Sequence, residues 1–335
     1  MKTVAFFNNK GGVGKTSLVY HLAWTYAGQG KRVLMVDLDP QSNLTAMCVS
    51  EERLEELWLP PDLERKSMRG AVQPIIDGTG DVRPAHLENL DDRLALIPGD
   101  IRLSEYEQKL SDAWPRTMDR DPAAFRVASS FHRVIHEAAQ RHEAELVLID
   151  VGPNLGALNR AALIAAEYVV TPVGADLFSV QGLKNLGPTL NDWRRQWADR
   201  LKVNPVDGLE LPTGAMQPAG YVVMQPNLYG GKVTKAYGRW LNEIPNVYSK
   251  NLLGKELNSE TTITNDPYAL AIVRHYRSLM PLAQAARKPI FQLTAADGAI
   301  GAHWKAVQQV GEEFRALARA VEDRLAMGQG GNGSR

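Results

Sequence analysis

The sequence predicts a doubly wound α/β fold, in which a mostly parallel sheet carries helices on both faces. The first observation is an apolar run at residues 4–7 that leads directly into a glycine-rich turn and a helical pattern. The second is another buried-strand pattern at 33–36, so that strand, helix and strand follow within about 40 residues and require a right-handed parallel crossover. The third is that further strand patterns alternate with helical ones along the chain.

The turn after the first strand has the composition of a phosphate-binding loop. Residues 10–16 read Lys-Gly-Gly-Val-Gly-Lys-Thr and stand directly before the helix. Backbone N–H groups of such a loop, together with the helix dipole, form a cradle for phosphate oxygens. Lys15 is expected to reach the β- and γ-phosphates, and the Thr16 hydroxyl to bind Mg²⁺. The predicted nucleotide contacts are Gly11, Gly12, Val13, Gly14, Lys15, Thr16 and Ser17.

A chance glycine-rich turn is the alternative, but it would not need Gly-Lys-Thr, a preceding strand and a following helix together. An ordinary loop of this kind has glycine six residues before the lysine, where this chain has Asn9, and Lys10 follows as a second lysine. The loop therefore resembles the deviant Walker A motif of the ParA/MinD family of P-loop ATPases. The resemblance implies that Lys10 crosses a dimer interface to the partner's nucleotide and that Lys10 and Lys15 both act in catalysis.

Acidic residues end two of the predicted strands, beside the loop at the carboxyl edge of the sheet. Asp150 follows four apolar residues, fits the Walker B position and is expected to hold Mg²⁺. Asp37 and Asp39 alternate onto one side of their strand, so both are expected to face the γ-phosphate. The resemblance implies that Asp39 orients the attacking water and that Asp37 lies near the metal, which makes Thr16, Asp37 and Asp150 the metal set. An Asx turn before Pro40 is the alternative for the first two.

The resemblance extends beyond the loop. Residues 150–156 resemble the family's second switch, with Gly152 and Asn154 as departures, and 162–183 resemble its next helix, strand and turn. Likeness is firm over 1–50 and 145–190 and weaker over 219–245 and 279–325. We interpret 1–327 as a single domain in which 100–132, 193–218 and 250–276 are insertions, followed by a flexible tail at 328–335.

The remaining elements are predicted from hydrophobic periodicity and from the positions of proline residues. Residues 51–93 are charged and broken by proline, which predicts short surface helices, and 100–143 are helical in pattern with the longest piece beginning at 121–122. A final helix is expected over 303–325. Further strands are expected at 94–97, 146–150, 168–173, 221–224 and 289–292.

Charge distribution suggests a partner. The net charge is zero, yet residues 1–183 carry 19 basic and 25 acidic side chains, whereas 184–335 carry 19 and 13. A basic face in the second half would suit nonspecific DNA; the alternative for each residue is a solvated helix face. The candidate DNA contacts are Arg194, Arg195, Arg200, Lys202, Lys232, Lys235 and Arg239.

Several classes are disfavoured. Cys48 is the only cysteine, which excludes an intrachain disulfide and argues against an iron–sulfur reductase, whose bridging cluster needs two cysteines per subunit. No apolar run approaches the roughly 20 residues that span a bilayer, so we expect a cytoplasmic, nucleoid-associated protein with no membrane partner. A dinucleotide-binding dehydrogenase is disfavoured because residues 12–17 lack a third glycine.

The resemblance implies an Mg²⁺-dependent ATPase that binds ATP and ADP and forms a homodimer with ATP. Such an enzyme would bind DNA nonspecifically and segregate or position a plasmid, a chromosome or a protein cargo, stimulated by a ParB-like or other adaptor. The alternative is a MinD-like positioning ATPase on a membrane or scaffold, without DNA binding. A membrane form would need a terminal amphipathic helix, whereas the last helix shows an apolar stripe typical of a core helix.

Overall fold

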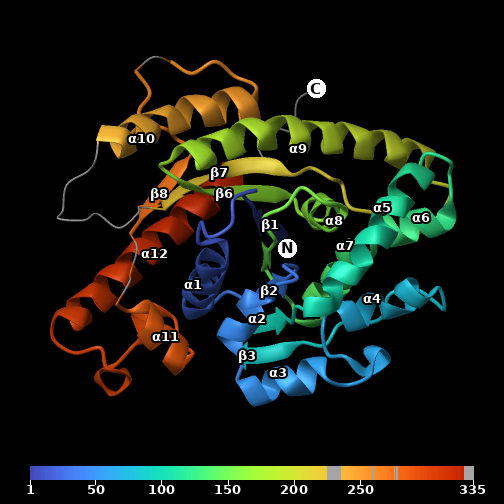
Figure 1. The fold of residues 1–335 in the computed structure, drawn as a ribbon, viewed down its shortest axis with the longest axis horizontal. Coiled ribbons are helices and arrows are strands. Elements are labelled where there is room, and N and C mark those ends of the chain that lie inside the picture. The colour runs from blue at the N-terminus through green and yellow to red at the C-terminus, as the bar shows by residue number, and fades with distance from the viewer. Residues whose placement is uncertain (225–234, 259, 275, 277, 328–335) are drawn as a thin grey trace.

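One sheet runs through the whole molecule. The computed structural model describes residues 1–224, 235–258, 260–274, 276 and 278–327. Within them, eight strands pair in the order β3-β4-β2-β5-β1-β6-β7-β8, and β3 alone is antiparallel to its neighbour (Figure 1). The strands are β1 (Lys2–Phe6), β2 (Val33–Asp37), β3 (Glu88–Asp91), β4 (Leu94–Ile97), β5 (Leu146–Asp150), β6 (Tyr168–Gly174), β7 (Gln217–Met224) and β8 (Ala269–Val273). This is the predicted doubly wound α/β fold.

Helices cover both faces of this sheet. One face carries α1 (Lys15–Gly28), α11 (Met280–Ala286) and α12 (Ala302–Met327). The other carries α4 (Met68–Asp77), α5 (Tyr106–Arg116), α6 (Pro122–Ala128), α7 (Ser130–Arg141), α8 (Ala157–Ile164), α9 (Leu177–Val203) and α10 (Lys235–Tyr248). Shorter elements are α2 (Asn43–Cys48), α3 (Glu51–Trp58), η1 (Asp62–Glu64), η2 (Ile101–Glu105), η4 (Ser249–Leu253), η5 (Ile290–Gln292) and η6 (Ala295–Asp297).

The central strands are buried on both sides. In β1, Val4 and Phe6 pack into the core beneath α1 and α12, whereas Ala5 belongs to the core on the other face. Two buried faces explain why these strands are continuous apolar runs rather than alternating ones. The carboxyl ends of β1, β2 and β5 are therefore held by rigid neighbours on every side.

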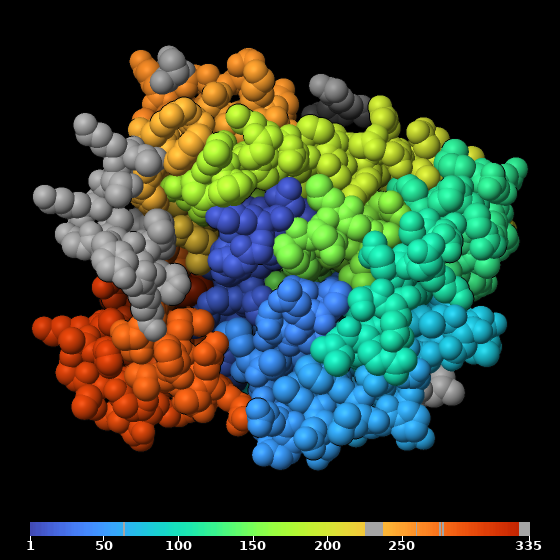
Figure 2. All heavy atoms as spheres, viewed as in Figure 1, coloured from blue at the N-terminus to red at the C-terminus, as the bar shows by residue number. Residues whose placement is uncertain are grey.

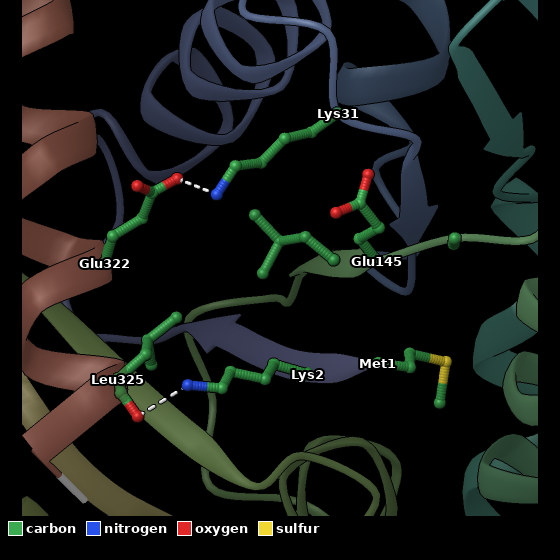
Figure 3. A pocket seen from close by; sticks show the side chains of 8 residues that line it. Met1, Lys2, Lys31, Glu145, Glu322 and Leu325 are labelled. Carbon is green, nitrogen blue, oxygen red and sulfur yellow. Dashed lines mark hydrogen bonds and ion pairs between the residues drawn. The ribbon is translucent and has the colours of Figure 1, made fainter.

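Helix α12 closes the opposite, amino edge of the sheet. Lys2 Nζ donates to the Leu325 carbonyl at 2.7 Å, and Lys31 forms an ion pair with Glu322. Figure 3 shows these two contacts at either side of a pocket of about 450 Å³ that Met1 and Glu145 also line. These contacts tie α12 to the amino edge of the sheet.

Most expected elements are present. The strands expected at 33–36, 94–97, 146–150, 168–173 and 221–224 are confirmed, and the helical pattern after the glycine-rich loop forms α1. The final helix, expected at 303–325, spans Ala302–Met327. The predicted tail at 328–335 lies outside the described residues.

The strand predicted at 289–292 is wrong. Pro289 cannot donate a ladder hydrogen bond, and the next residues form the single turn η5. Ile290 is fully buried, and its backbone N–H donates to His21 Nε2 at 3.2 Å, so the apolar residues anchor a turn on α1. The eighth strand is instead β8, which lies within the predicted insertion at 250–276. Its two alanines weaken the strand pattern in the sequence.

The prediction of surface helices over 51–93 is also wrong in part. Helix α4 is largely buried, including Arg69, which is 2% exposed. Its guanidinium can be buried because it pairs with Asp62 at 3.2 Å and Glu105 at 2.7 Å. Strand β3 was not predicted at all. The piece expected from 121–122 does begin there, capped by the Asp121 side chain, but it divides at Ser129 into α6 and α7.

Close packing of α9 yields a first prediction. A Cβ built at Gly187 would lie 1.9 Å from the Asn251 carbonyl oxygen, so Gly187→Ala must push α9 away from η4. We expect a loss of about 1–3 kcal/mol in the free energy of unfolding, measured by urea denaturation. Gly238→Ala in α10 is the matched control, because nothing lies within 4 Å of its Cβ, and it should be neutral or stabilising. Equal effects of the two substitutions would contradict the packing argument.

Candidate nucleotide site

The loop between β1 and α1 has the backbone of an anion cradle. Gly12 and Gly14 adopt φ of 71° and 79°, in the left-handed region that favours glycine. Gly14 is the N-cap of α1 and supplies no side-chain cap, so the first-turn N–H groups point into the loop. A cavity of about 380 Å³ lies there, lined by residues 11–16 together with Asp39, Gln41, Asn43 and Pro153. In Figure 2 the dark blue N-terminal segment reaches the surface in the middle of this face, beside the yellow-green α9.

Lys15 places a buried positive charge at this cradle. The side chain is 7% exposed, and Nζ lies 3.3 Å from the carbonyl oxygens of Asn8 and Lys10. Burial lowers the pKa of Lys15, and the carboxylates of Asp150 and Asp39 oppose that change. A desolvated ammonium beside open backbone N–H groups is suited to phosphate.

Lys10 lies at the rim and not over the loop. Its Nζ forms an ion pair with Asp176 Oδ2 at 2.7 Å, and both side chains are about one-third exposed. Asp176 is the N-cap of α9, where it accepts a hydrogen bond from the Ser179 N–H at 3.0 Å. The sequence analysis missed Asp176, although an aspartate three residues before a serine at a helix start is a capping signal.

The three predicted carboxylates meet at the ends of adjacent strands. Asp150 on β5 is in register with Phe6 on β1 and with Asp37 on β2. Asp37 and Asp150 are fully buried, and Asp39 is 7% exposed. The topology therefore brings together residues that are more than a hundred positions apart in the chain.

Asp150 has a buried and unsatisfied carboxylate. Within the described part of the chain neither of its oxygens has a hydrogen-bond partner. Burial raises the pKa of Asp150 well above its usual range, and the charges of Asp37 and Asp39 add to this; Thr16 and Lys15 oppose it in part. Since an unpaired buried carboxylate is costly, the site is suited to a cation.

The donor set fits Mg²⁺. The orphaned oxygens of Asp150 and the neighbouring Thr16 hydroxyl are hard oxygen ligands. No group of three or more His, Cys, Asp or Glu residues capable of holding a metal occurs among the residues that the structure describes. Mg²⁺ usually keeps several waters and is bound through one or two protein oxygens together with phosphate oxygens.

Asp37 and Asp39 differ in what they face. Asp37 Oδ2 accepts from the Thr45 N–H at 2.9 Å and from its hydroxyl at 2.7 Å, and Asp37 is not among the cavity-lining residues. Burial raises the pKa of Asp37 to about 7, and these Thr45 bonds oppose the rise. Asp39 lines the cavity and accepts from the Gln41 N–H at 3.0 Å. The Asx-type contact considered as an alternative is thus present, and it turns Asp39 toward the phosphate cradle.

A second, more apolar pocket adjoins the loop. It has a volume of about 310 Å³ and shares residues 12–14 with the phosphate cavity. Its other walls come from β7, β8, α11 and α12 and include Met224, Val273, Tyr276 and Phe314. Arg274 lies in it and pairs with Glu313 at 3.7 Å. Sequence reasoning missed these residues because they are dispersed over 90 positions and carry no motif.

The predicted DNA contacts divide into two groups. Arg195, Lys202 and Arg239 have side chains that are 76%, 73% and 70% exposed, each beside an acidic residue of its own helix. Arg195 and Lys202 are seven residues apart on one side of α9, and exposed Lys184, eleven residues earlier, shares that side. Lys232 lies outside the described residues, as does the side chain of Lys235.

Two other candidates are engaged inside the protein. Arg200 is 6% exposed, donates to the Trp114 carbonyl and stacks on the Trp114 ring at 4.0 Å. Arg194 donates to the carbonyls of Ala215 at 2.7 Å and Met216 at 2.8 Å. Helical periodicity turns these two arginines away from the exposed side of α9, so the prediction of Arg200 as a surface contact is wrong and Arg194 is a structural residue.

The family described as an AAA domain (AAA_31) matches residues 1–203. The chain belongs to this family. It is 33% identical over 204 residues to the chromosome-partitioning ATPase Soj of Thermus thermophilus, covering 61% of this chain and 67% of Soj. It is 31% identical over 196 residues to protein IncC of Escherichia coli, covering 58% of this chain and 47% of IncC. The chain is thus a ParA-like P-loop protein of the AAA_31 family, and its match spans about half the length of IncC.

Solved structures extend the similarity of this AAA_31 protein to nearly its whole length. Protein DIP2308 of Corynebacterium diphtheriae has a TM-score of 0.71 at 25% identity and covers 98% of this chain and 100% of its own. The ATP complex of McdA from Cyanothece has a TM-score of 0.62 at 17% identity, covering 96% of each chain. The second likeness concerns the fold alone; it shows that a protein of this fold binds ATP. Among the described helices of the AAA_31 chain, none is long and apolar enough to cross a membrane.

The unsatisfied carboxylate yields a second prediction. Asp150→Asn removes a buried charge, so the nucleotide-free protein should gain about 1 kcal/mol or more in the free energy of unfolding at pH 7. Because the folded-state pKa is raised, the protonated form stabilises the protein below the unfolded pKa near 4, and this stability is lost as the pH rises. The gain measured by urea denaturation should therefore be larger at pH 7 than at pH 4.5. Asp37→Asn is the comparison and should gain less stability, because the two Thr45 hydrogen bonds partly offset the burial of its carboxylate.

Proposed function

We propose that this protein is an Mg²⁺-dependent ATPase of the ParA type, which positions or segregates a cargo. The observation that carries the proposal is the junction of a glycine cradle, a desolvated Lys15 and the unsatisfied Asp150 at the ends of three central strands. Packing of the hydrophobic core alone would not require buried charged groups that are this costly to desolvate. A triphosphate with its metal would satisfy the exposed N–H groups, the ammonium and the carboxylate at once.

Each residue then has a role in hydrolysis. Thr16 and Asp150 would hold Mg²⁺, which when bound neutralises phosphate charge. Lys15 binds the phosphate oxygens. Asp39, which lines the same cavity, orients the attacking water. Asp37 acts indirectly, because its hydrogen bonds with Thr45 hold the end of β2 in place.

The apolar pocket next to the loop is suited to the base of the nucleotide. It adjoins the phosphate cavity through residues 12–14, and its walls offer the flat and flexible side chains of Tyr276, Phe314 and Met224. A purine bound there would have its phosphates directed toward Lys15. We therefore assign ATP or ADP, with the base in the apolar pocket.

Hydrolysis and binding can be separated by substitution. Asp39→Ala should retain ATP binding and lower kcat by at least about a hundredfold, because the water is no longer oriented. Lys15→Ala should lose nucleotide binding itself, since phosphate charge is uncompensated. Phosphate release and calorimetric titration with a nonhydrolysable analogue measure the two effects. Undiminished turnover in Asp39→Ala would falsify its assignment.

Lys10 supports an ATP-dependent dimer. The loop carries it as a second lysine, as in the deviant Walker A motif, and its charge is held at the rim by Asp176. Beside it, Leu177 and Phe178 at the start of α9 are 51% and 74% exposed, an unusual exposure for large apolar residues next to a ligand site. A second copy across this rim would cover them and could receive Lys10 at its own nucleotide.

Assembly should therefore follow nucleotide. With a nonhydrolysable ATP analogue, sedimentation should show a shift from monomer to dimer at tens of micromolar or below. Lys10→Ala should lower kcat at least about tenfold, since it removes charge from the partner's site, and leave the Kd for ATP largely unchanged. Phe178→Ser should weaken the dimer with intact nucleotide binding. A nucleotide-saturated monomer at those concentrations would contradict the sandwich arrangement.

The exposed basic side of α9 is the proposed DNA contact. It presents Lys184, Arg195 and Lys202, and the neighbouring α10 adds Arg239. Ion pairs with acidic neighbours at such exposure are weak and leave these cations available to phosphates. A dimer would join two such surfaces, and avidity can then rise by about 10²–10⁴. DNA would serve as the matrix on which a plasmid, a chromosome or a protein cargo moves, with a ParB-like or other adaptor stimulating hydrolysis.

The MinD-like alternative has less support. Its membrane form needs a free amphipathic helix, but the apolar stripe of α12 is buried in the core: Val307, Val310, Phe314, Leu317, Val321 and Leu325. The other form of this alternative is a positioning ATPase that binds a protein scaffold instead of DNA.

Binding to random duplex DNA should require ATP, ignore base sequence and fall steeply with salt, since counterion release drives it. The triple variant Lys184→Glu, Arg195→Glu and Lys202→Glu should reduce it at least about tenfold, with unchanged ATP affinity. Lys305→Glu on α12, which covers the other face of the sheet, is the matched control. Gel retardation at low salt measures the effect. If wild-type protein with ATP fails to retard DNA, a scaffold becomes the better explanation.

A further inference from the structure

Helix α8 begins beside the nucleotide cavity without a cap from its own chain segment. Its N-cap is Gly156, which has no side chain to accept a hydrogen bond. The first-turn N–H groups are instead bound by Glu107 of α5: Ala157 N–H donates to Oε1 at 2.5 Å and Leu158 N–H donates to Oε2 at 2.8 Å. One carboxylate thus satisfies two orphan donors and places its negative charge at the positive end of the helix.

The start of α8 and helix α5 are in close contact. A Cβ at Gly156 would lie 2.5 Å from Glu107 Oε1, so a larger residue there would require the Glu107 carboxylate to shift from its place at α8. Glu107 is held by a rigid helix, since Tyr106 and Leu110 beside it are buried. In α8, burial lowers the pKa of Arg160 to about 10, and the Glu107 carboxylate opposes the shift. Its guanidinium stacks on Trp114 of α5 at 4.2 Å, so the two helices meet at two points.

The first turn of α8 in turn holds the loop that borders the cavity. Asn159 is 1% exposed, and its Nδ2 donates to the carbonyls of Gly152 at 2.8 Å and Asn154 at 2.7 Å. Pro153 between them lines the phosphate cavity. Gly152 lies against the proposed water-orienting residue: a Cβ there would be 3.3 Å from Asp39 Oδ1. A displacement of α8 would therefore move this loop relative to Asp39.

We propose that Glu107 is a positioning residue of the hydrolytic site, which caps α8 from α5 and thereby fixes the loop 152–156 against Asp39. The proposal rests on the proposed ATPase function. Glu107 itself is not among the residues that line the phosphate cavity. It acts through Asn159 and the loop, so it should govern the rate of the hydrolytic step and not the affinity of the cradle for ATP.

The test compares Glu107→Ala and Glu107→Gln with Gln108→Ala, a matched control on the exposed side of α5 whose side chain donates to Asp112 in its own helix. Glu107→Ala should lower kcat about two- to thirtyfold, the factor to which loss of a helix cap corresponds. The Kd for a nonhydrolysable ATP analogue should stay within about twofold of wild type. Glu107→Gln keeps one acceptor and should be intermediate, and it decides the matter if the alanine variant does not fold. The control should change neither value.

A second readout does not depend on activity. Hydrogen exchange of the amides at residues 152–158 in the nucleotide-free protein should accelerate in Glu107→Ala and remain unchanged in Gln108→Ala. Unchanged kcat, or a Kd that weakens by the same factor as kcat, would overturn the proposal, because a merely structural cap affects both. Wild-type protein without turnover would count against the proposed function. Wild-type turnover that Glu107→Ala leaves intact counts against the Glu107 assignment alone.

Discussion

The candidate site is organised around the buried carboxylate of Asp150, which has no hydrogen-bond partner among the described residues. Parallel pairing with β1 and β2 places this fully buried carboxylate at the carboxyl ends of the central strands. Its unsatisfied oxygens lie among Asp37, Asp39 and Lys15, so charge is concentrated in a region of low dielectric. The large surrounding core can tolerate this cost, and a ligand that brings both a cation and an anion would relieve it.

The two faces of the sheet serve this site differently. The face with α1 and α12 supplies the phosphate cradle and the apolar pocket, because α1 begins at the loop and α12 contributes Phe314. The other face supplies the elements that can respond to partners: α9 begins at Asp176 beside Lys10, and α8 begins at the loop next to Asp39. Because Glu107 of α5 caps α8, helix α5 is also connected to the loop next to Asp39. The proposed phosphate binding and its consequences would thus be divided between two packed layers.

Errors in the sequence reading share a physical cause. The apolar residues at 289–292 were interpreted as a strand, but Ile290 is buried as an anchor on α1, and periodicity over four residues cannot distinguish the two. Arg200 was interpreted as a surface cation, whereas Trp114 covers it from another helix. Arg69 was placed in surface helices, although Glu105 permits its burial. In each case the deciding neighbour is distant in sequence.

The sequence by itself determined the fold class, the central strands, the cradle and the identity of the three carboxylates. It could do so because glycine conformations, strand periodicity and the Gly-Lys-Thr motif are local properties. Only the tertiary structure decided that Asp39 lines the cavity while Asp37 faces Thr45, that Lys10 pairs with Asp176, and that Glu107 caps α8. Those contacts join residues that are remote in the chain or differ only in side-chain direction, and the parallel register of buried strands is what sets them.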